Sequence, residues 1–363
     1  MTADNIPQLE QIPDAARAAL TEFLEERRPV VGSIGAPVTR SIAYLEDFVL
    51  GGGKRIRPLY AWAGFVGAGG LDGDEDLQAV LRAASSLEFI QACALIHDDI
   101  IDASSTRRGK PTVHRAVAGR HRQAHWHGDA DFFGESVAIL VGDMALAWAE
   151  DMLQDSGLSA AALARTREPW RAMRTEVIGG QLLDITLEAT GSESVELAGA
   201  VNRYKTAAYT IERPLHLGAA IAGASPTLID AFRGYGRDIG VAFQLRDDQL
   251  GVFGDPSVTG KPAGDDLREG KRTVLLAIAL ERADEADPAA AATLRRLVGT
   301  TDDPADITTM SQIIQDSGAV EAIEEHIDTL TESGLEHLHA AGVDEKVSAA
   351  LRDLAIRATS RQK

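Results

Sequence analysis

The sequence predicts an all-α fold. Residues that favour helices, chiefly Ala, Leu, Glu and Arg, are abundant, and aromatic residues make up only 5% of the chain, which argues against a β-sandwich or barrel. Two apolar runs with helical spacing each end in a pair of aspartates, Asp98-Asp99 and Asp247-Asp248. Glycines such as Gly51-Gly52-Gly53 supply the stops that end helical segments.

The expected helices follow from these stops and from the apolar periodicity. The first is amphipathic and covers residues 7–28, and the second, about 36–50, ends at the triple glycine. Pro214 should kink the helix that contains it, because proline removes one backbone hydrogen bond. The remaining helices are expected at about 76–102, 134–154, 158–190, 195–223 and 227–253, with three or four amphipathic helices in 286–363.

The length and charge of the chain limit its organisation and its partners. At 363 residues it exceeds the usual single-domain range, yet no Pro/Gly/Ser-rich linker and no block of charge divides it, so we expect one domain over 1–363. The net charge of -19 argues against nucleic acid as a partner, because a phosphate backbone is bound by basic surfaces. A phosphorylated small molecule is not excluded, since local Lys, Arg and metal ions determine that contact.

The sequence also predicts a cytoplasmic protein. Its single cysteine, Cys93, cannot form an intrachain disulfide and suits a reducing compartment. Residues 1–5 show neither the basic nor the apolar part of a signal peptide. The apolar stretch from Ser136 to Ala149 is interrupted by Asp143 and is too short to span a bilayer, so no transmembrane segment is expected.

The first aspartate motif, Asp98-Asp99-Ile100-Ile101-Asp102, predicts a metal site. Asp98 and Asp102 are four residues apart, so a helix places them on one face, while Asp99 lies about a third of a turn away. Carboxylates at a helix C-terminus repel one another and the helix dipole, so a cation is expected there. Mg²⁺ fits best, because it prefers oxygen ligands and couples carboxylates to phosphates. Arg107 and Arg108 follow and can bind phosphate oxygens.

The second motif repeats this pattern in Phe243-Gln244-Leu245-Arg246-Asp247-Asp248-Gln249-Leu250-Gly251. An apolar run again leads into paired aspartates. Two such motifs could face each other across a helical bundle and hold one diphosphate through several metal ions.

Seven motifs occur along the chain in the order found in the trans-isoprenyl diphosphate synthases, the polyprenyl synthetase family, which the sequence resembles. They are the two aspartate motifs, Gly51 to Pro58, Arg107-Arg108-Gly109, Gly180 to Asp184, Lys205-Thr206, and Gly260-Lys261 through Gly270-Lys271. The match runs from about Arg40 to about Leu280 and is closest to bacterial geranylgeranyl diphosphate synthases and their longer-chain relatives. The resemblance implies a single helical bundle around a deep central cavity, a homodimer, and Mg²⁺-dependent head-to-tail (1′-4) condensation of isopentenyl diphosphate with an allylic diphosphate.

The resemblance also assigns roles to individual residues. About three Mg²⁺ ions per active site would be bound by Asp98, Asp102 and Asp247, with Asp99, Asp184, Asp248 and Asp266 in support. Isopentenyl diphosphate would be bound by Lys54, Arg57, Gln91 and Arg108. The allylic diphosphate (dimethylallyl, geranyl or farnesyl) would be bound by Arg107, Lys205 and Lys261, and Lys271 would also bind substrate. Ionisation of that diphosphate would depend on the metal ligands together with Arg107, Lys205, Thr206, Gln244 and Lys261.

Chain length should be determined just upstream of Asp98. Helical side chains one turn back lie below the aspartates, and here they are the small Cys93 and Ala94. In the resembled family bulky aromatic residues at this level stop growth early. Their absence implies products of at least twenty carbons, with Phe89 and Ile90, one turn deeper, as candidate floor of the cavity.

Four alternatives remain open. The product could be longer than geranylgeranyl diphosphate. Gly251 replaces the third aspartate of the second motif and could mark a weakly active partner subunit of a heteromeric synthase. A class I terpene cyclase also uses a DDxxD motif with Mg²⁺, but it has no second diphosphate for Lys54 and Arg57 to hold. An HD-type phosphohydrolase would need more helical histidines than His97.

Two segments have no assigned role. The tract from His121 to His127, with Asp129 and Asp131 following, could bind zinc but lacks companion cysteines, so we expect a loop elaboration. The C-terminal helices in 286–363 carry no motif. The sequence leaves the allylic primer, the final chain length and the oligomeric state undetermined.

Overall fold

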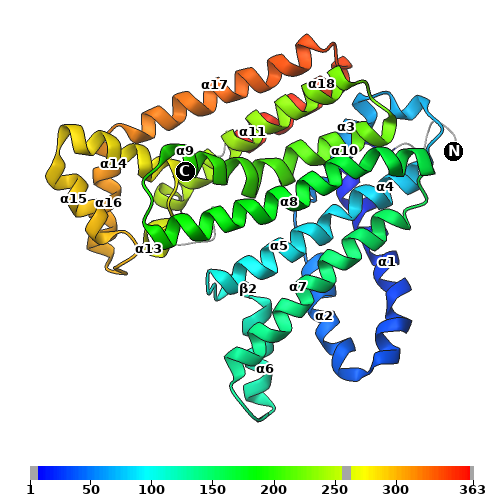
Figure 1. Cartoon of the computed structure of the whole chain (residues 1–363), viewed down its shortest axis with the longest axis horizontal. Helices are drawn as coiled ribbons and strands as arrows, with labels where there is room; N and C mark the ends of the chain where they lie inside the picture. Colours follow the sequence, from blue (N-terminus) through cyan, green and yellow to red (C-terminus); the bar gives the residue numbers. More distant parts are fainter. Residues whose placement is uncertain (1–6, 256–262, 360–363) are drawn as a thin grey trace. The chain divides into compact units, whose positions relative to one another are not determined.

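The computed structural model describes residues 7–255 and 263–359 (Figure 1). Helices account for 81% of the chain and strands for 1%. The all-α prediction is therefore confirmed.

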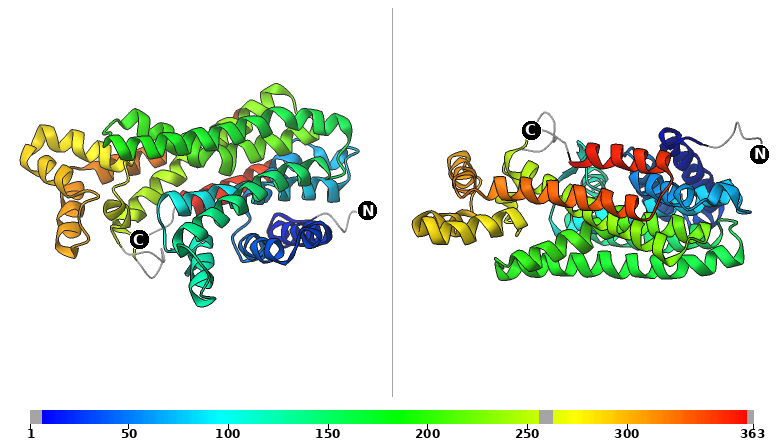
Figure 2. Two further views of the ribbon diagram at one scale, coloured as in Figure 1. Left: turned by 60° about the horizontal axis from the view of Figure 1, so that its bottom comes forward. Right: turned by 90° about the horizontal axis from the view of Figure 1, so that it is seen from above.

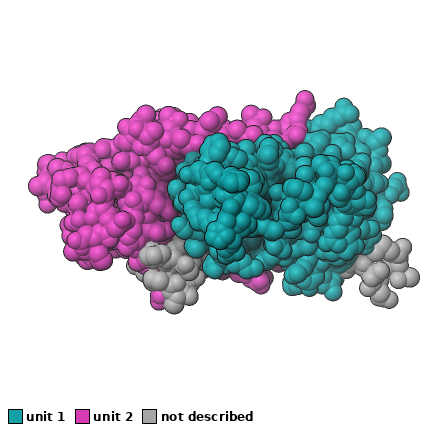
Figure 3. Space-filling model, turned by 90° about the horizontal axis from the view of Figure 1, so that it is seen from below, with its two compact units in different colours: residues 1–169, 214–224 teal, residues 170–213, 225–363 magenta. Residues whose placement is uncertain are grey.

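The chain forms two compact units, which Figure 3 shows in different colours. Unit 1 comprises Met1–Pro169 and Pro214–Ala224, and unit 2 comprises Trp170–Arg213 and Ser225–Lys363. Each unit is made from two separate stretches of sequence, so neither corresponds to one half of the chain. The expectation of a single domain over 1–363 stays a prediction.

Unit 1 contains the N-terminal helices around an aromatic core. The rings of Phe23 and Phe89 pack edge to face with centroids 5.4 Å apart, and Trp148 lies edge-on to both. Its elements are η2 (Leu9–Gln11), α1 (Ile12–Ile34), α2 (Ala36–Leu50), α3 (Ile56–Gly67), η3 (Gly70–Asp72), α4 (Leu77–Ser85), α5 (Leu87–Ile101), β1 (Thr106–Arg107), β2 (Lys110–Pro111), α6 (Val113–Gln123), α7 (Ala130–Gln154), the start of α8 (Ala160–Thr190) and most of α10 (Arg213–Ala222).

Two glycines allow α3 and α10 to pack closely. A Cβ at Gly64 would overlap the carbonyl of Leu215, and a Cβ at Gly218 would overlap the carbonyl of Ala61. Only glycine permits this approach of two helix backbones. The contact fixes α3, and with it the basic segment at the start of that helix.

Unit 2 is built on α11 (Pro226–Phe253), with α17 (Ala319–Ala340) packed along it (Figures 1 and 2). Leu245, Leu275 and Ile323 are buried in its apolar core. The other elements are the rest of α8, α9 (Val195–Val201), η4 (Asn202–Glu212), α13 (Asp265–Glu269), α14 (Val274–Ala286), α15 (Pro288–Leu297), α16 (Pro304–Asp316) and α18 (Glu345–Thr359). The prediction of three or four helices in 286–363 is confirmed, since α15 to α18 lie there.

Most predicted helix positions are confirmed, with three corrections. The first helix continues past Pro29 and ends at Ile34 rather than at residue 28. The predicted helix 76–102 is two helices, α4 and α5, because a turn interrupts it at Ser86. The predicted helix 195–223 is α9, η4 and α10 in succession.

η4 is a π-helix that ends just before the proline predicted to disturb this segment. Pro214 has no N–H group, so one carbonyl a turn upstream lacks its α-helical donor. In a π-helix the bonds span five residues instead of four, and such segments are frequent at functional sites. η4 carries the motif Lys205-Thr206, so the unusual geometry falls on a predicted site.

Two stretches are long and apolar enough to cross a membrane by length and composition alone, Leu77–Ile101 and Ala130–Gln154. The apolar window of the first is 72% buried, which is typical of a core helix. That of the second, α7, is only 39% buried, so this helix presents apolar side chains to the outside. The absence of a transmembrane segment stays a prediction.

Candidate functional site

A basic segment joins α2 to α3. Gly52 and Gly53 have φ of +120° and +123°, a region that favours glycine, and the chain then enters α3 at Ile56. Lys54 precedes the helix and is exposed, whereas Arg57 is within the helix and buried. The two cations therefore approach a ligand from the loop and from the helix separately.

Arg55 is a residue of this segment that the sequence analysis missed. It is buried, and its Nη1 donates to Oε2 of the equally buried Glu88 on α5 at 2.5 Å. Its Nη2 also donates to the carbonyl of Val49. Arg55 thereby ties the end of α2 and the start of α3 to α5, the helix of the first aspartate motif.

The β1–β2 hairpin brings two further arginines to the same region. Its turn residues Arg108 and Gly109 have φ of +52° and +72°, which is the backbone of a two-residue type I′ turn. Nη1 of Arg108 donates to the Gly52 carbonyl at 2.8 Å. Partial desolvation lowers the pKa of the Arg108 guanidinium. The charge of Glu88 acts in the opposite direction, and the positive charges of Arg55, Arg107 and Arg57 lower the pKa further. So many cations in one place favour an anionic ligand.

Asp98, Asp99 and Asp102 end α5 beside this basic region. Asp98 and Asp102 are half-buried, whereas Asp99 is 1% exposed. Nε of Arg107 donates to Asp99 at 2.7 Å, and its Nη2 donates to Asp98 at 3.3 Å. Arg107 therefore orients the two carboxylates, and its positive charge lies where an anionic ligand could bind.

The acidic residues of α5 fit the predicted Mg²⁺. Two half-buried carboxylates four residues apart offer oxygen ligands, which Mg²⁺ prefers, and this ion commonly takes its remaining ligands from waters and substrate phosphates. In residues 7–255 and 263–359, no three His, Cys, Asp or Glu side chains form a group that could hold a metal ion by themselves. The donor set therefore suits an ion that a diphosphate helps to bind.

The predicted chain-length residues differ in accessibility. Cys93 and Ala94 are half-buried on α5, whereas Phe89 and Ile90 are buried. The Phe89 ring is enclosed by Phe23 and Trp148, as described above. Of the four, Cys93 and Ala94 keep surface that a substrate can reach, and the roles of all four stay predictions. Gln91 is half-buried on the same helix.

The second aspartate motif lies on α11 in unit 2. Asp247 is half-buried and Asp248 is buried. Burial raises the pKa of Asp248 to about 7, although hydrogen bonds from Gln244 (2.8 Å) and Asn202 (3.2 Å) act in the opposite direction. Asp248 is thus enclosed by side chains, and Asp247 is the more accessible carboxylate. Asn202 is a partner that the sequence analysis did not identify.

The motifs on α8 and η4 meet in unit 2. A Cβ at Gly180 would overlap the backbone of Lys205, so this glycine lets the two helices approach closely. Nζ of Lys205 donates to the carboxylate of Asp184. Gln181 follows Gly180 and Thr206 follows Lys205 in the sequence, and both side chains are half-buried. The structure therefore brings together two motifs that the sequence analysis treated separately.

Lys271, another predicted cation, lies just after the end of α13. Its Nζ lies 2.8 Å from the Glu269 carboxylate and 3.5 Å from that of Asp266. The predicted ligand Lys261 lies outside the described residues.

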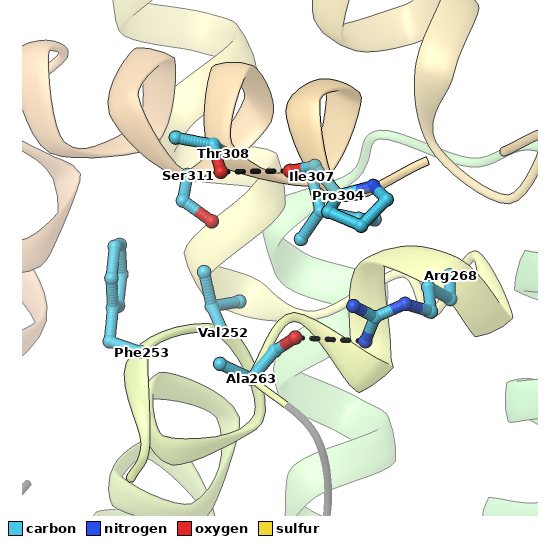
Figure 4. Close-up of a pocket in the computed structure, with 8 residues that line it drawn as sticks. All are labelled: Val252, Phe253, Ala263, Arg268, Pro304, Ile307, Thr308 and Ser311. Carbon is cyan, nitrogen blue, oxygen red and sulfur yellow. Dashed lines mark hydrogen bonds between the residues drawn. The ribbon is translucent and has the colours of Figure 1, made fainter. Parts of the chain in front are cut away.

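A cavity of about 500 Å³ lies where α11, α13 and α16 meet (Figure 4). At the edge of the cavity, Nη1 of Arg268 donates a hydrogen bond of 2.8 Å to the Ala263 carbonyl. The rest of the cavity lining is largely apolar and consists of Val252, Phe253, Pro304, Ile307, Thr308 and Ser311. None of these is a predicted site residue.

Two histidines that the sequence analysis considered, His121 and His97, make packing contacts in the structure. We expected the tract from His121 to His127 to form a loop. His125 and His127 do lie in the connection between α6 and α7, but His121 is in α6, where its Nε2 lies 3.0 Å from the His127 carbonyl and its ring packs on Trp126. Nε2 of His97 lies 3.1 Å from the Ile139 carbonyl, where α5 packs on α7. Both rings therefore contribute to helix packing.

The two aspartate motifs belong to different units, Asp98 and Asp102 to unit 1 and Asp247 to unit 2. The expectation that they face each other across one diphosphate stays a prediction. The role assigned to each site residue likewise stays a prediction.

Comparison with known proteins identifies the family. A family profile described as Polyprenyl synthetase matches residues 40–316. A solved geranylgeranyl pyrophosphate synthase from Corynebacterium glutamicum, complexed with isoprenyl diphosphate and magnesium, is 64% identical with a TM-score of 0.95 and covers 98% of this chain and 100% of its own.

More distant relatives agree. A geranylfarnesyl diphosphate synthase from Aeropyrum pernix is 35% identical over 278 residues, which is 75% of this chain and 79% of that protein. A polyprenyl synthase structure from Caulobacter crescentus, complexed with calcium and isoprenyl diphosphate, is 28% identical with a TM-score of 0.75 and covers 98% of both chains. The chain therefore belongs to the polyprenyl synthetase family.

Proposed function

We propose that the chain is a prenyltransferase that joins isopentenyl diphosphate to an allylic diphosphate, head to tail, and releases geranylgeranyl diphosphate. The observation that carries this proposal is in unit 1, where the charges of Arg57 and Arg108 act together with that of Arg107, and Arg107 donates to Asp99 of the first aspartate motif. Cations and metal-binding carboxylates side by side suit two diphosphates rather than one. The C. glutamicum relative, named as a geranylgeranyl pyrophosphate synthase, supports the twenty-carbon product.

The basic segment would bind isopentenyl diphosphate. Arg57 is buried at the start of α3, where helix N–H groups are not yet paired within the helix and favour an anion. Arg108 is held over Gly53 by its bond to the Gly52 carbonyl, and its guanidinium can bind phosphate oxygens bidentately. Lys54 adds an exposed charge. The donor would thus be fixed by its diphosphate, with its double bond left available for reaction.

The allylic diphosphate would meet the aspartate motifs and the cations of unit 2. Lys205, held by Asp184, would neutralise charge on the departing diphosphate, and Lys271 would add to this. Thr206 and Gln244 would lie beside the allylic cation. A bound Mg²⁺ would supply Lewis-acid stabilisation of the leaving diphosphate, with Asp98, Asp102 and Asp247 as its protein ligands and about three ions per site.

The remaining part of the reaction needs no side-chain base. The allylic C–O bond breaks and both electrons leave with the diphosphate. The isopentenyl double bond attacks the cation, and the released diphosphate takes the proton. Exclusion of water by an apolar cavity is required, because water would convert the cation to an alcohol.

The small side chains at Cys93 and Ala94 support a product of at least twenty carbons, and dimethylallyl, geranyl and farnesyl diphosphates would serve as primers. We further propose a cytoplasmic homodimer without a transmembrane segment. The exposed apolar residues of α7, among them Phe132 (71% exposed) and Leu140 (67%), support a protein partner at this helix. The single cysteine supports a reducing compartment.

One incubation tests the proposed reaction. The purified chain, with MgCl₂, farnesyl diphosphate and labelled isopentenyl diphosphate, should yield geranylgeranyl diphosphate by mass spectrometry. Asp98→Asn should abolish extension, whereas Asp131→Asn, which removes a half-buried carboxylate paired with Arg115 and Arg122, should not. A cyclised hydrocarbon, free phosphate alone or no conversion by the wild type would contradict the proposal.

A further inference from the structure

The π-helix η4 packs along α11 through two glycines of α11. A Cβ at Gly236 would overlap the backbone of Glu212, and a Cβ at Gly240 would overlap Ala207. The two glycines are four residues apart, so they lie on one face of α11. Because only glycine permits so close an approach, these contacts fix the second half of η4 against α11.

Glu212, the last residue of η4, is a buried carboxylate between two cations. It is 1% exposed. Its Oε2 lies 2.5 Å from Nη1 of Arg203, the second residue of the same π-helix. Its Oε1 accepts a hydrogen bond of 3.1 Å from Nε of Arg233 on α11. Because Arg203 and Glu212 stand at opposite ends of η4, their contact constrains how the helix winds between them.

The next residue, Arg213, attaches the same end of η4 to α8. Its side chain is 6% exposed, and its Nε and Nη2 donate to the two carboxylate oxygens of Glu176 at 2.8 and 2.6 Å. Glu176 lies one turn before Gly180, the glycine at which α8 approaches the backbone of Lys205. The end of η4 is therefore held to α11 through Glu212 and to α8 through Arg213.

A buried carboxylate between arginines is not explained by stability alone. The loss of hydration largely offsets the attraction between such charges, and apolar residues of similar volume often stabilise a fold as well or better. The best-attested use of buried polar groups is to select one register among alternatives. For η4 the alternative is an ordinary α-helix, whose hydrogen bonds span four residues instead of five. That change would turn Lys205 and Thr206 about the helix axis relative to Glu212.

We infer that Glu212 is a positioning residue for the proposed transfer reaction. Its carboxylate, paired with Arg203 and Arg233, keeps η4 π-helical. This geometry in turn holds Lys205 against the carboxylate of Asp184. The inference rests on the proposed function, in which Lys205 neutralises charge on the departing diphosphate. Glu212 acts through the helix that carries Lys205.

The test is the rate at which acetic anhydride acetylates Lys205 in the folded protein, measured by mass spectrometry of peptides, because this readout needs no turnover. Lys271 is the internal reference, since its side chain is similarly exposed (26%, against 23% for Lys205) and also lies against a carboxylate. Glu212→Gln keeps the size of the side chain and removes its charge, so η4 should relax and Lys205 should leave Asp184. Acetylation of Lys205 relative to Lys271 should rise roughly tenfold or more, as expected when one hydrogen bond to a charged group is lost. An unchanged or lower rate would overturn the inference.

A matched variant separates this role from a general loss of stability. Asp238 is a buried carboxylate on α11 that also pairs with an arginine, Arg237, but it accepts its other hydrogen bond from Ser333 on α17. Asp238→Asn should therefore lower the thermal midpoint without changing the acetylation of Lys205, compared at a temperature at which all variants are folded. If Asp238→Asn accelerates this acetylation as much as Glu212→Gln does, Glu212 has no specific effect on η4 and the inference is overturned.

Two glycine substitutions test the same register without removing a charge. Gly236→Ala pushes on the backbone of Glu212, whereas Gly234→Ala, two residues earlier on α11, meets the ring of His337 on α17. Gly236→Ala should accelerate the acetylation of Lys205 and Gly234→Ala should not, and equal rates in the two variants would overturn the inference. If Gly236→Ala does not fold, Glu212→Gln and its control still decide the question. Failure of the wild type to extend farnesyl diphosphate would refute the proposed reaction, while the acetylation rates would still support or overturn the register that Glu212 is inferred to hold.

Discussion

Nε of Arg107 lies 2.7 Å from Oδ1 of Asp99, a carboxylate that is almost entirely buried. The bond joins the β1–β2 hairpin to the last turn of α5, beside the half-buried Asp98 and Asp102. Because the same guanidinium also reaches Asp98 through Nη2 at 3.3 Å, it determines how two consecutive carboxylates are oriented.

The first prediction concerns this bond. Asp99→Asn replaces a charge-assisted hydrogen bond by a neutral one, so Arg107 and Asp98 should lose their fixed orientation. We expect kcat/KM for isopentenyl diphosphate addition to fall about ten- to hundredfold, the range typical for residues that orient metal ligands. Asp155→Asn, at an exposed carboxylate paired with Arg27, is the matched control and should leave kcat/KM unchanged. Equal activity of the two variants would refute a positioning role for Asp99.

The second prediction concerns the buried pair of Arg55 and Glu88. Glu88→Gln should leave an uncompensated buried cation, which typically costs about 3 to 5 kcal/mol of unfolding free energy. Urea denaturation measures the loss. Glu46→Gln removes the half-buried partner of the exposed Arg28 and should cost less than about 1 kcal/mol. If Glu88→Gln lowers the free energy of unfolding equally little, another group must compensate the buried charge of Arg55.

Several elements could be predicted from the sequence because they depend on local spacing. Asp98 and Asp102 are four residues apart, so any helix that contains them places them on one face. The glycines after Leu50 likewise end a helix because of their own backbone preferences. The pairing of Arg55 with Glu88 could not be predicted. Arg55 has the same local setting as Lys54 and Arg57, and burial distinguishes it only once α3 and α5 pack.

Contacts between residues far apart in the chain could not be predicted either, because they also depend on how the helices pack. Asn202 bonds to Asp248, and Asp266 fills the space beside Gly251, but each pair joins residues far apart in the chain. The π geometry of η4 also depends on tertiary packing, at Gly180 among other places, and propensity alone could not reveal it.

The third prediction concerns the reactivity of Cys93. Burial raises the pKa of this thiol to about 12, and the charge of Asp143 adds to the effect. Compared with an ordinary value of 9.0, the native thiolate fraction is about a thousandfold lower, so alkylation by iodoacetamide at pH 8.5 should be slow until the protein unfolds. Rapid modification of the native protein would contradict this.

The same shift fixes the sign of a pH effect on stability. Above pH 9 the unfolded thiol loses its proton while the folded thiol keeps it, so unfolding releases a proton and the free energy of unfolding falls as pH rises from 9 towards 12. Cys93→Ser should remove this part of the pH dependence. Urea denaturation of the two proteins at pH 8 and pH 10 measures it.

The fourth prediction concerns the exposed apolar face of α7. If a second copy of the chain covers this helix, Leu140→Asp should place a charge in the interface and produce monomers, measured by light scattering after gel filtration. Ile356→Asp on α18 is the matched control, since Ile356 is also exposed (47%) but lies on another helix. A dimer that persists in Leu140→Asp would place the interface elsewhere.

The fifth prediction concerns product length and follows from the accessibility of Ala94. This residue lies one turn before Asp98 on α5 and keeps accessible surface, whereas Phe89 deeper in the helix is fully enclosed. Phenylalanine at position 94 would fill the level that a growing chain must pass, so Ala94→Phe should shift the products to fifteen carbons or fewer, measured by mass spectrometry. Ala94→Ser keeps the small size and should leave the product unchanged. If Ala94→Phe stays active and still makes the wild-type product, the chain does not grow past this side of α5.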